Sequence, residues 1–166
     1  MTPTFNRKHT LNRVYKSLLK QDYMLFEWLL IDDGSTDLTK DLIKELKKEA
    51  PFKIRYKYQR NGGKHRAHNT GVLMARGILT IILDSDDTLV EGAIRIIWNS
   101  WHSISENEKN NYAGVWANCI DENGVVTGKE IKSPFIEGRL FELTERKMIV
   151  GEKLPCFRTD LLKIIK

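Results

Sequence analysis

Cysteine and long hydrophobic segments are both scarce in this sequence. Its 166 residues include only two cysteines, Cys119 and Cys156, too few and too far apart for a disulfide framework or a four-ligand zinc site. We expect both to be reduced, buried thiols. The longest apolar run, residues 77–83, falls well short of the roughly 20 residues that span a bilayer. We therefore expect a soluble cytoplasmic protein with no transmembrane segment, and leave open a peripheral position at the membrane face.

Several catalytic and cofactor-binding motifs are also absent. The sequence contains no H-E-x-x-H, no G-x-G-x-x-G and no G-x-S-x-G. Gly63-Lys64 does not belong to a Walker loop, because Tyr58 stands where the first glycine is needed and His65 where serine or threonine is needed. The 27 Lys and Arg exceed the 22 Asp and Glu, for a formal charge of +5. This excess predicts affinity for anions: nucleotide phosphates, nucleic acid or an acidic membrane.

Hydrophobic periodicity predicts alternating helices and strands up to about residue 105. Helical spacing marks residues 8–20, 38–46 and 89–101, and the turn signal at 61–63 with Gly77 marks a helix at 64–76. Apolar runs mark strands at 26–31 and 78–83, and alternation marks a short strand at 54–58. We expect Ser35 or Thr36 to cap the second helix and Asp87 to cap the fourth. The almost wholly apolar run 78–83 predicts a strand covered on both faces. This order is typical of an α/β fold with a mostly parallel sheet.

The pattern changes after residue 105. Residues 112–119 predict a strand, 122–124 a turn and 125–127 the start of a partner strand, which together make a small hairpin. Residues 133–166 are mixed, with one late helix at 159–165. The hydrophobic share of 41% is enough for a core, and the length fits one domain.

Two acidic segments follow predicted strands. They are Asp32-Asp33-Gly34-Ser35-Thr36-Asp37 and Asp84-Ser85-Asp86-Asp87. In an open parallel sheet the carboxyl ends of strands meet at one crevice, so we expect both segments to face it. Asp84 and Asp86 point the same way along an extended chain and offer oxygen ligands of the kind that Mg²⁺ or Mn²⁺ prefers. The alternative, which is commoner for an isolated D-x-D, is a helix cap within a polar turn.

A basic segment follows the turn at Asn61. Gly62-Gly63-Lys64-His65-Arg66 combines backbone N–H groups at a helix start with positive side chains, which suits a phosphate. A solvated basic helix start is an equally good interpretation of these residues alone.

Four ordered motifs together resemble the family 2 glycosyltransferases. They are Pro3-Thr4-Phe5-Asn6-Arg7, Ile31 to Asp37, Asn61-Gly62-Gly63 with Asn69-Thr70-Gly71, and Leu83-Asp84-Ser85-Asp86-Asp87. The resemblance implies the GT-A fold, a Rossmann-like, mostly parallel sheet flanked by helices, here with a small mixed β region toward the C-terminus. It implies one domain over 1–166, with a nucleotide-sugar-binding half at 1–105 and a partial acceptor-side region at 106–166.

The resemblance also implies an activity. It is inverting transfer from a nucleotide-diphosphate sugar, most often a UDP-sugar, with Mn²⁺ or Mg²⁺, to a carbohydrate or lipid-linked acceptor in surface polysaccharide synthesis. By position, Thr4 and Phe5 would lie against the base, and Asp33 would hold the base or ribose. Lys64 would lie near the donor.

The resemblance also implies roles for the two aspartates of the D-x-D motif, Asp84 and Asp86. Asp84 would sit near the ribose and diphosphate, and Asp86, with Asp87, would address the metal. The family's general base lies in a later acidic motif, which we expect beyond Lys166. Five acidic residues remain candidates by chemistry, although none stands in a matching motif: Glu137, Glu142, Glu145, Glu152 and Asp160.

The amino end also departs from the family pattern. Only Met1 and Thr2 precede Pro3, where the family has an apolar first strand, so we expect a truncated chain or a misassigned start. Three other functions remain open: a nucleotide-sugar-binding fragment without a base, a basic nucleic-acid-binding domain, and a nucleotidyltransferase. The last normally has a Gly-rich loop after its first strand, and residues 1–10 contain no glycine. Self-association is also open.

Overall fold

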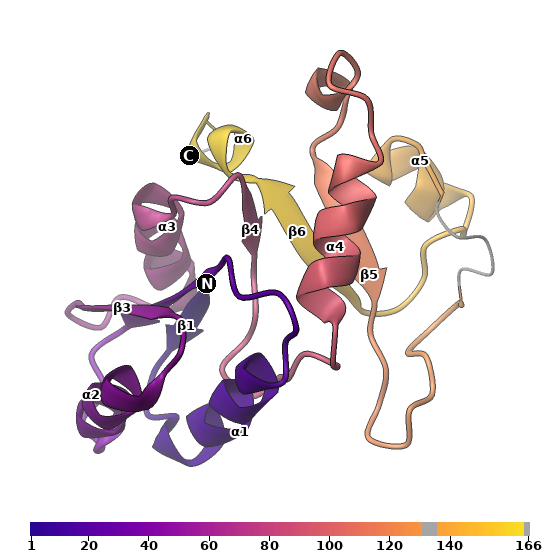
Figure 1. Cartoon of the computed structure of the whole chain (residues 1–166). Helices are drawn as coiled ribbons and strands as arrows, with labels where there is room; N and C mark the ends of the chain where they lie inside the picture. The colour runs from indigo at the N-terminus through magenta and orange to yellow at the C-terminus, as the bar shows by residue number, and fades with distance from the viewer. Residues whose placement is uncertain (131–135, 165–166) are drawn as a thin grey trace. The chain divides into compact units, whose positions relative to one another are not determined.

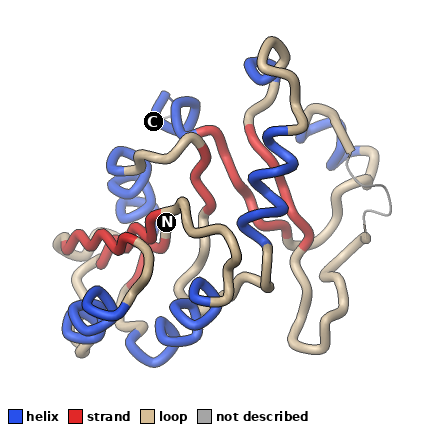
Figure 2. Tube along the Cα trace, in the orientation of Figure 1, coloured by secondary structure: helices blue, strands red, loops and turns tan. Residues whose placement is uncertain are grey.

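The computed structural model describes residues 1–130 and 136–164 (Figure 1). The chain divides into two compact units. The first contains residues up to Val115 together with the stretch from Cys156 onward, and the second runs from Trp116 to Pro155. Figure 2 shows that helices and strands alternate through the first unit. The predicted α/β class is therefore confirmed.

The first sheet is parallel throughout and has the order β1-β2-β3. Its strands are β1 (Thr2–Thr4), β2 (Glu27–Asp32) and β3 (Lys53–Tyr58). The register pairs Thr4 with Asp32 and Asp32 with Tyr58, so all three strands end at the same edge. Chain segments that leave this edge are thereby brought close together.

Helices cover both faces of the first sheet. They are α1 (Lys8–Leu19), α2 (Thr39–Glu49) and α3 (Lys64–Met74), and Figure 1 shows α3 on the face opposite α1 and α2. Side chains alternate along β2. Leu29 and Ile31 form a core cluster with Ala67 of α3, whereas the Trp28 ring stacks on Tyr15 of α1 at a centroid distance of 6.3 Å. Burial on both faces explains why β2 is almost wholly apolar.

Gly71 lies inside α3, where glycine costs about 1 kcal/mol relative to alanine. The structure gives a reason for it. A Cβ at this position would come within 2.1 Å of the Met1 Sδ and 3.2 Å of the Ile31 Cγ1. The glycine therefore lets α3 lie close against the sheet.

The second sheet corrects one prediction. Its order is β4-β6-β5, from β4 (Leu79–Ile81), β6 (Lys153–Arg158) and β5 (Gly114–Asn118). The run 78–83 thus contributes a short strand that pairs antiparallel with β6, rather than a strand of the parallel sheet. Ile78 is exposed and only Thr80 of β4 is buried, so the strand is not covered on both faces.

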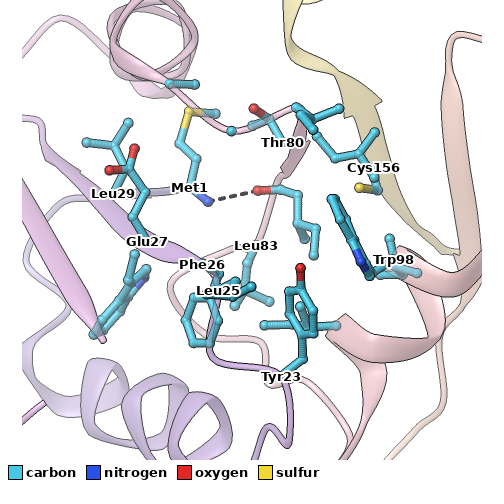
Figure 3. A pocket seen from close by; sticks show the side chains of 18 of the residues that line it. Met1, Tyr23, Leu25, Phe26, Glu27, Leu29, Thr80, Leu83, Trp98 and Cys156 are labelled. Atoms are coloured by element: carbon cyan, nitrogen blue, oxygen red, sulfur yellow. Dashed lines mark hydrogen bonds between the residues drawn. The ribbon is translucent and has the colours of Figure 1, made fainter. Parts of the chain in front are cut away.

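Met1 links β4 to the first sheet. Its amine donates to the Ile81 carbonyl at 2.8 Å, and the Leu83 N–H donates to the Met1 carbonyl at 3.0 Å. Figure 3 shows this amine beside a cavity of about 160 Å³ that Trp98 and Cys156 also line. Burial lowers the pKa of the amine to about 6. Burial likewise raises the pKa of the Cys156 thiol to about 12, and both cysteines are thiols, with Cys119 only half-buried.

The remaining helices of the first unit are α4 (Ala93–His102), the short 3-10 helix η1 (Lys109–Asn111) and α6 (Thr159–Ile164). Two predicted caps are wrong. Helix α4 starts after Gly92, which has a φ of 73°, and not at Asp87. Helix α2 starts at Thr39, whose N–H bonds to the Asp37 carboxylate at 3.0 Å, so neither Ser35 nor Thr36 caps it. Both errors arise because turns longer than the periodicity suggests precede these helices.

The second unit is mostly loop. The predicted hairpin is present as a single antiparallel bridge between Ile120 and Val126, closed by the Asp121 side chain, which accepts bonds from the backbone of the turn. Helix α5 (Leu140–Glu145) was not predicted from the sequence. Within the described residues, no helix has the length and apolar character needed to cross a membrane.

Candidate functional site

A cleft of about 310 Å³ lies at the strand ends of the first unit. Six of the seven residues singled out from the sequence line it, namely Thr4, Phe5, Asp33, Lys64, Asp84 and Asp86. Pro3, Arg7, Asn61, Gly63, Ala67 and Ser85 complete the lining, and Asp87 is outside it. The structure thus brings together the segments after β1, β2 and β3 and the turn after β4.

The first acidic segment is held by its own carboxylates. The fully buried Asp32 accepts a bond from the Ser35 N–H at 2.8 Å and another from the Tyr56 hydroxyl at 2.7 Å. Gly34 has a φ of 86°, and a Cβ there would lie 2.8 Å from the Asn61 nitrogen. The chain therefore makes a tight turn directly after β2 and stays close to the loop after β3.

Asp33 organises that neighbouring loop. Its carboxylate accepts bonds from the Gln59 side chain at 2.6 Å and from the N–H groups of Gly62 and Gly63, the shortest at 2.7 Å. Burial by itself raises the pKa of Asp33, but these bonds together outweigh it and hold the pKa below its usual value. The buried carboxylate is therefore ionised, and it fixes the start of α3.

Asn6 was not singled out from the sequence. It has a φ of 52°, and its side-chain oxygen accepts bonds from the N–H groups of Thr36 at 2.8 Å and Asp37 at 3.3 Å. Its own N–H donates to the Ser35 hydroxyl at 2.9 Å. Asparagine tolerates left-handed backbone better than most residues, which was the available signal. We call these three hydrogen bonds the clamp at Asn6. The clamp holds Phe5 and Arg7, on either side of Asn6, at the cleft.

The second acidic segment is held by basic side chains. Lys64 lies 2.7 Å from the Asp84 carboxylate, and Arg7 lies 3.7 Å from the Asp86 carboxylate. Arg13 of α1 donates to the Asp86 carbonyl at 3.0 Å. The side chains of both pairs are between 38% and 68% exposed. The carboxylates therefore face solvent in the cleft and are only loosely neutralised.

Two further side chains at the cleft suit an organic ligand. Thr4 is 3% exposed, and its buried hydroxyl has no hydrogen-bond partner among the described residues. Phe5, next to it, is 46% exposed although it is aromatic. A buried polar atom normally finds a partner, so this hydroxyl is an exception among the residues that line the cleft.

The comparison with known sequences decides the family. The sequence matches the family model Glycosyl transferase family 2 over residues 1–161. The chain belongs to glycosyl transferase family 2. It is 29% identical over 98% of its length to a "GalNAc(5)-diNAcBac-PP-undecaprenol beta-1,3-glucosyltransferase" of Campylobacter jejuni, and covers 52% of that protein.

Another relative in the family is "UDP-Glc:alpha-D-GlcNAc-diphosphoundecaprenol beta-1,3-glucosyltransferase WfgD" of Escherichia coli. It is 30% identical over 76% of this chain, which covers 47% of that protein. The chain therefore spans about half the length of these two glycosyltransferases.

Solved structures confirm the GT-A type of α/β fold. The TarS 1–349 fragment of S. aureus, solved in complex with UDP, superposes with a TM-score of 0.69 at 21% identity, over 99% of this chain and 47% of that fragment. The mannosyltransferase PcManGT of Pyrobaculum calidifontis, solved in complex with GDP-Man and Mn²⁺, gives a TM-score of 0.68 at 18% identity, over 99% of this chain and 45% of that one. At these identities the likeness concerns the fold.

The cleft of this family 2 chain fits a hard divalent cation only in part. The described residues include no group of three or more His, Cys, Asp or Glu side chains that could hold a metal by themselves. Asp84 and Asp86 supply carboxylate oxygens, and Mg²⁺ commonly takes one or two carboxylates together with substrate phosphates. The donor set therefore fits a cation whose remaining ligands come from a bound diphosphate.

The candidate general bases are exposed and stand in various local settings. Asp160 pairs with Arg158 at 2.6 Å, and this pairing lowers the pKa of Asp160. In the second unit, Glu142 lies 3.9 Å from Arg139, and Glu137, Glu145 and Glu152 are exposed. Nothing in these local contacts selects one of them as a base.

Proposed function

We propose that this chain binds a nucleotide-diphosphate sugar, specifically a UDP-sugar, and that it transfers the sugar with inversion to an acceptor hydroxyl. The observation that carries the proposal is the cleft in which Asp84 and Asp86 face Lys64 and Arg7 beside an unpartnered Thr4 hydroxyl. The family supports the reaction type.

The nucleoside occupies the side of the cleft formed by the segments after β1 and β2. Phe5 offers an exposed aromatic ring for the base, and Thr4 lies next to it in the lining of the cleft. Asp33 is the ionised acceptor in this part of the cleft, on the base or ribose side. Nucleotides in proteins of this fold support the proposal, since TarS was solved in complex with UDP and with UDP-GlcNAc, and PcManGT with GDP-Man.

The diphosphate occupies the side where acidic and basic groups meet. Asp84 lies near the ribose and diphosphate, and Lys64 at the start of α3 offers a positive charge. Asp86 would hold Mn²⁺ or Mg²⁺, with Asp87 next to it in the sequence but outside the lining of the cleft. When bound there, the cation supplies positive charge against the diphosphate that leaves the sugar. Without it the two carboxylates would repel the donor.

The acceptor is a carbohydrate carried on a lipid. The relatives from Campylobacter and Escherichia are named for undecaprenol-linked substrates, and this supports a role in surface polysaccharide synthesis at the membrane face. In this proposal residues 1–105 form the donor half of one domain, and residues 106–166 belong to the acceptor side. The proposal assigns no general base.

Isothermal titration with UDP and with GDP, each with Mn²⁺ and again with EDTA, tests the donor site. We expect UDP to bind more tightly than GDP and only with Mn²⁺. Asp86→Ala should weaken UDP binding about tenfold or more, because it removes a ligand oxygen, and should leave the circular dichroism spectrum unchanged. The control is Asp41→Ala, which removes an exposed carboxylate from α2. UDP binding that is equal for both variants would contradict the metal assignment.

A further inference from the structure

Each carboxylate of the Asp84 to Asp86 turn has its own basic partner, and each partner comes from a different element. Lys64 is the first residue of α3, and Arg7 precedes the first residue of α1. The Lys64 to Asp84 distance is 2.7 Å and the Arg7 to Asp86 distance is 3.7 Å. Two negative and two positive groups therefore stand in one cleft.

Backbone hydrogen bonds on both sides of Arg7 fix its position. It follows Asn6, whose left-handed backbone and bonds to Ser35, Thr36 and Asp37 fix the turn. The Arg7 carbonyl accepts the first N–H bonds of α1, from Thr10 at 3.0 Å and Leu11 at 3.1 Å. The guanidinium thus extends from a fixed point beside the cleft.

Asp86 is also held in place independently of Arg7. Arg13 donates to the Asp86 carbonyl at 3.0 Å, and this bond positions the turn without involving the carboxylate. Loss of the Arg7 contact would therefore leave the Asp86 backbone where it is. The contact between Arg7 and Asp86 is long and half-exposed, so it is a weak pair that another cation can replace.

A divalent cation and a guanidinium cannot share one carboxylate without repelling each other. A diphosphate, by contrast, offers several oxygens, and arginine recognises phosphate through a planar pair of N–H donors. A guanidinium displaced from Asp86 would find this second partner in the same cleft. The exchange preserves the charge balance once both the cation and the diphosphate are bound.

We propose that Arg7 is a donor-binding residue with two alternating partners, the Asp86 carboxylate before the donor enters and the diphosphate of the nucleotide sugar afterwards. This inference rests on the proposed function. It gives Arg7 opposite effects on two ligands: it competes with the cation for Asp86, and it attracts the diphosphate.

The test compares Arg7→Gln with Arg95→Gln in two titrations. Arg95 is an equally exposed arginine paired with Asp22 away from the cleft, so its variant loses the same charge. In titrations with MnCl₂ alone, Arg7→Gln should bind Mn²⁺ about threefold more tightly than the wild type. In titrations with UDP at saturating Mn²⁺, Arg7→Gln should bind about tenfold more weakly. Arg95→Gln should match the wild type in both.

Arg7→Lys separates charge from shape. It keeps the positive charge, so it should restore wild-type Mn²⁺ binding but only part of the UDP affinity, since lysine lacks the planar fork. If the wild type binds UDP and the two variants Arg7→Gln and Arg95→Gln bind it equally tightly, the role of Arg7 is overturned. The proposed function is then still intact. Wild type that does not bind UDP with Mn²⁺ would overturn both.

Discussion

The two acidic segments of the first unit are built in opposite ways. In the segment after β2, the Asp32 and Asp33 carboxylates are buried and accept most of their bonds from backbone N–H groups. In the segment after β4, the Asp84 and Asp86 carboxylates are partly exposed and face lysine and arginine side chains. Both segments follow strands, and both have the sequence pattern of aspartate-rich turns.

This difference separates the carboxylates that fix the shape of the cleft from the carboxylates that can change their binding partner. A buried carboxylate bonded by backbone N–H groups cannot leave them without stranding those donors, which costs free energy. An exposed ion pair with a long side chain contributes little and is easily replaced. The first segment therefore fixes the geometry of the cleft, and the second is the part that can turn to a ligand.

Among the substitutions that test this difference, we expect the largest loss of stability from a change at Asp32. Asp32→Ala would leave the Ser35 N–H and the Tyr56 hydroxyl without their partner, so the free energy of unfolding should fall by about 3 kcal/mol. Asp84→Ala is the matched control and should cost less than about 0.5 kcal/mol. Urea unfolding followed by tryptophan fluorescence measures both. Equal losses in the two variants would mean that the two segments are not built differently.

A smaller effect should appear in the pH dependence of stability. The folded-state pKa of Asp33 lies below the ordinary value of 3.8, so the unfolded chain takes up a proton first as the pH falls. Stability from this group is full above about pH 4 and is lost as the pH drops through the folded-state pKa. Asp33→Asn should therefore be about 1 kcal/mol less stable than wild type at pH 7, and the gap should narrow toward pH 2.

Urea unfolding at a series of pH values measures this gap. Asp41→Asn, which changes an exposed carboxylate on α2, is the control for the loss of one negative charge. A gap between Asp33→Asn and wild type that stays constant from pH 7 to pH 2 would contradict the prediction. It would indicate that the bonds to the Gly62 and Gly63 N–H groups do not depend on ionisation.

The smallest expected effect is on the second segment. Lys64→Gln removes the partner of Asp84, yet the free energy of unfolding should change by less than about 0.5 kcal/mol, because the lysine side chain is 68% exposed. The measurement is again the urea midpoint at neutral pH and low salt. If the free energy of unfolding falls by more than about 1 kcal/mol, the pair of Lys64 and Asp84 contributes to the stability of the fold and the second segment resembles the first.

The sequence predicted those helices and strands that are marked by residues close together in the chain. The helices at 8–20 and 64–76 and the strand at 26–31 match α1, α3 and β2 closely. The first has a strong apolar period, the second lies between the turn signal at 61–63 and Gly77, and the strand is a compact apolar run. Strand β6 was missed, because Lys153–Arg158 contains a proline and no apolar run. Its pairing with β4, such as Phe157 with Thr80, joins residues far apart in the chain.

The site shows the same division between local and distant signals. The convergence of the two acidic segments was predicted from the rule that parallel strands end at one crevice, and the cleft residues were named on that basis and on the family resemblance. The segments do meet in the cleft, although β4 is not a strand of the parallel sheet. The clamp at Asn6 depends on a single left-handed residue, and the pairing of Arg7 with Asp86 joins residues that are distant along the chain. Asn6 and Arg7 stand in the first of the four family motifs, but the motif does not say which residues they contact.

The Cys156 thiol has a consequence for kinetics. It is fully buried and its pKa is raised to about 12, so the reactive thiolate is almost absent while the pairing of β4 with β6 is intact. Alkylation at Cys156 must then wait for the strands to separate. The rate of its modification, compared with that of the half-buried Cys119, would report local opening of this sheet in the native protein.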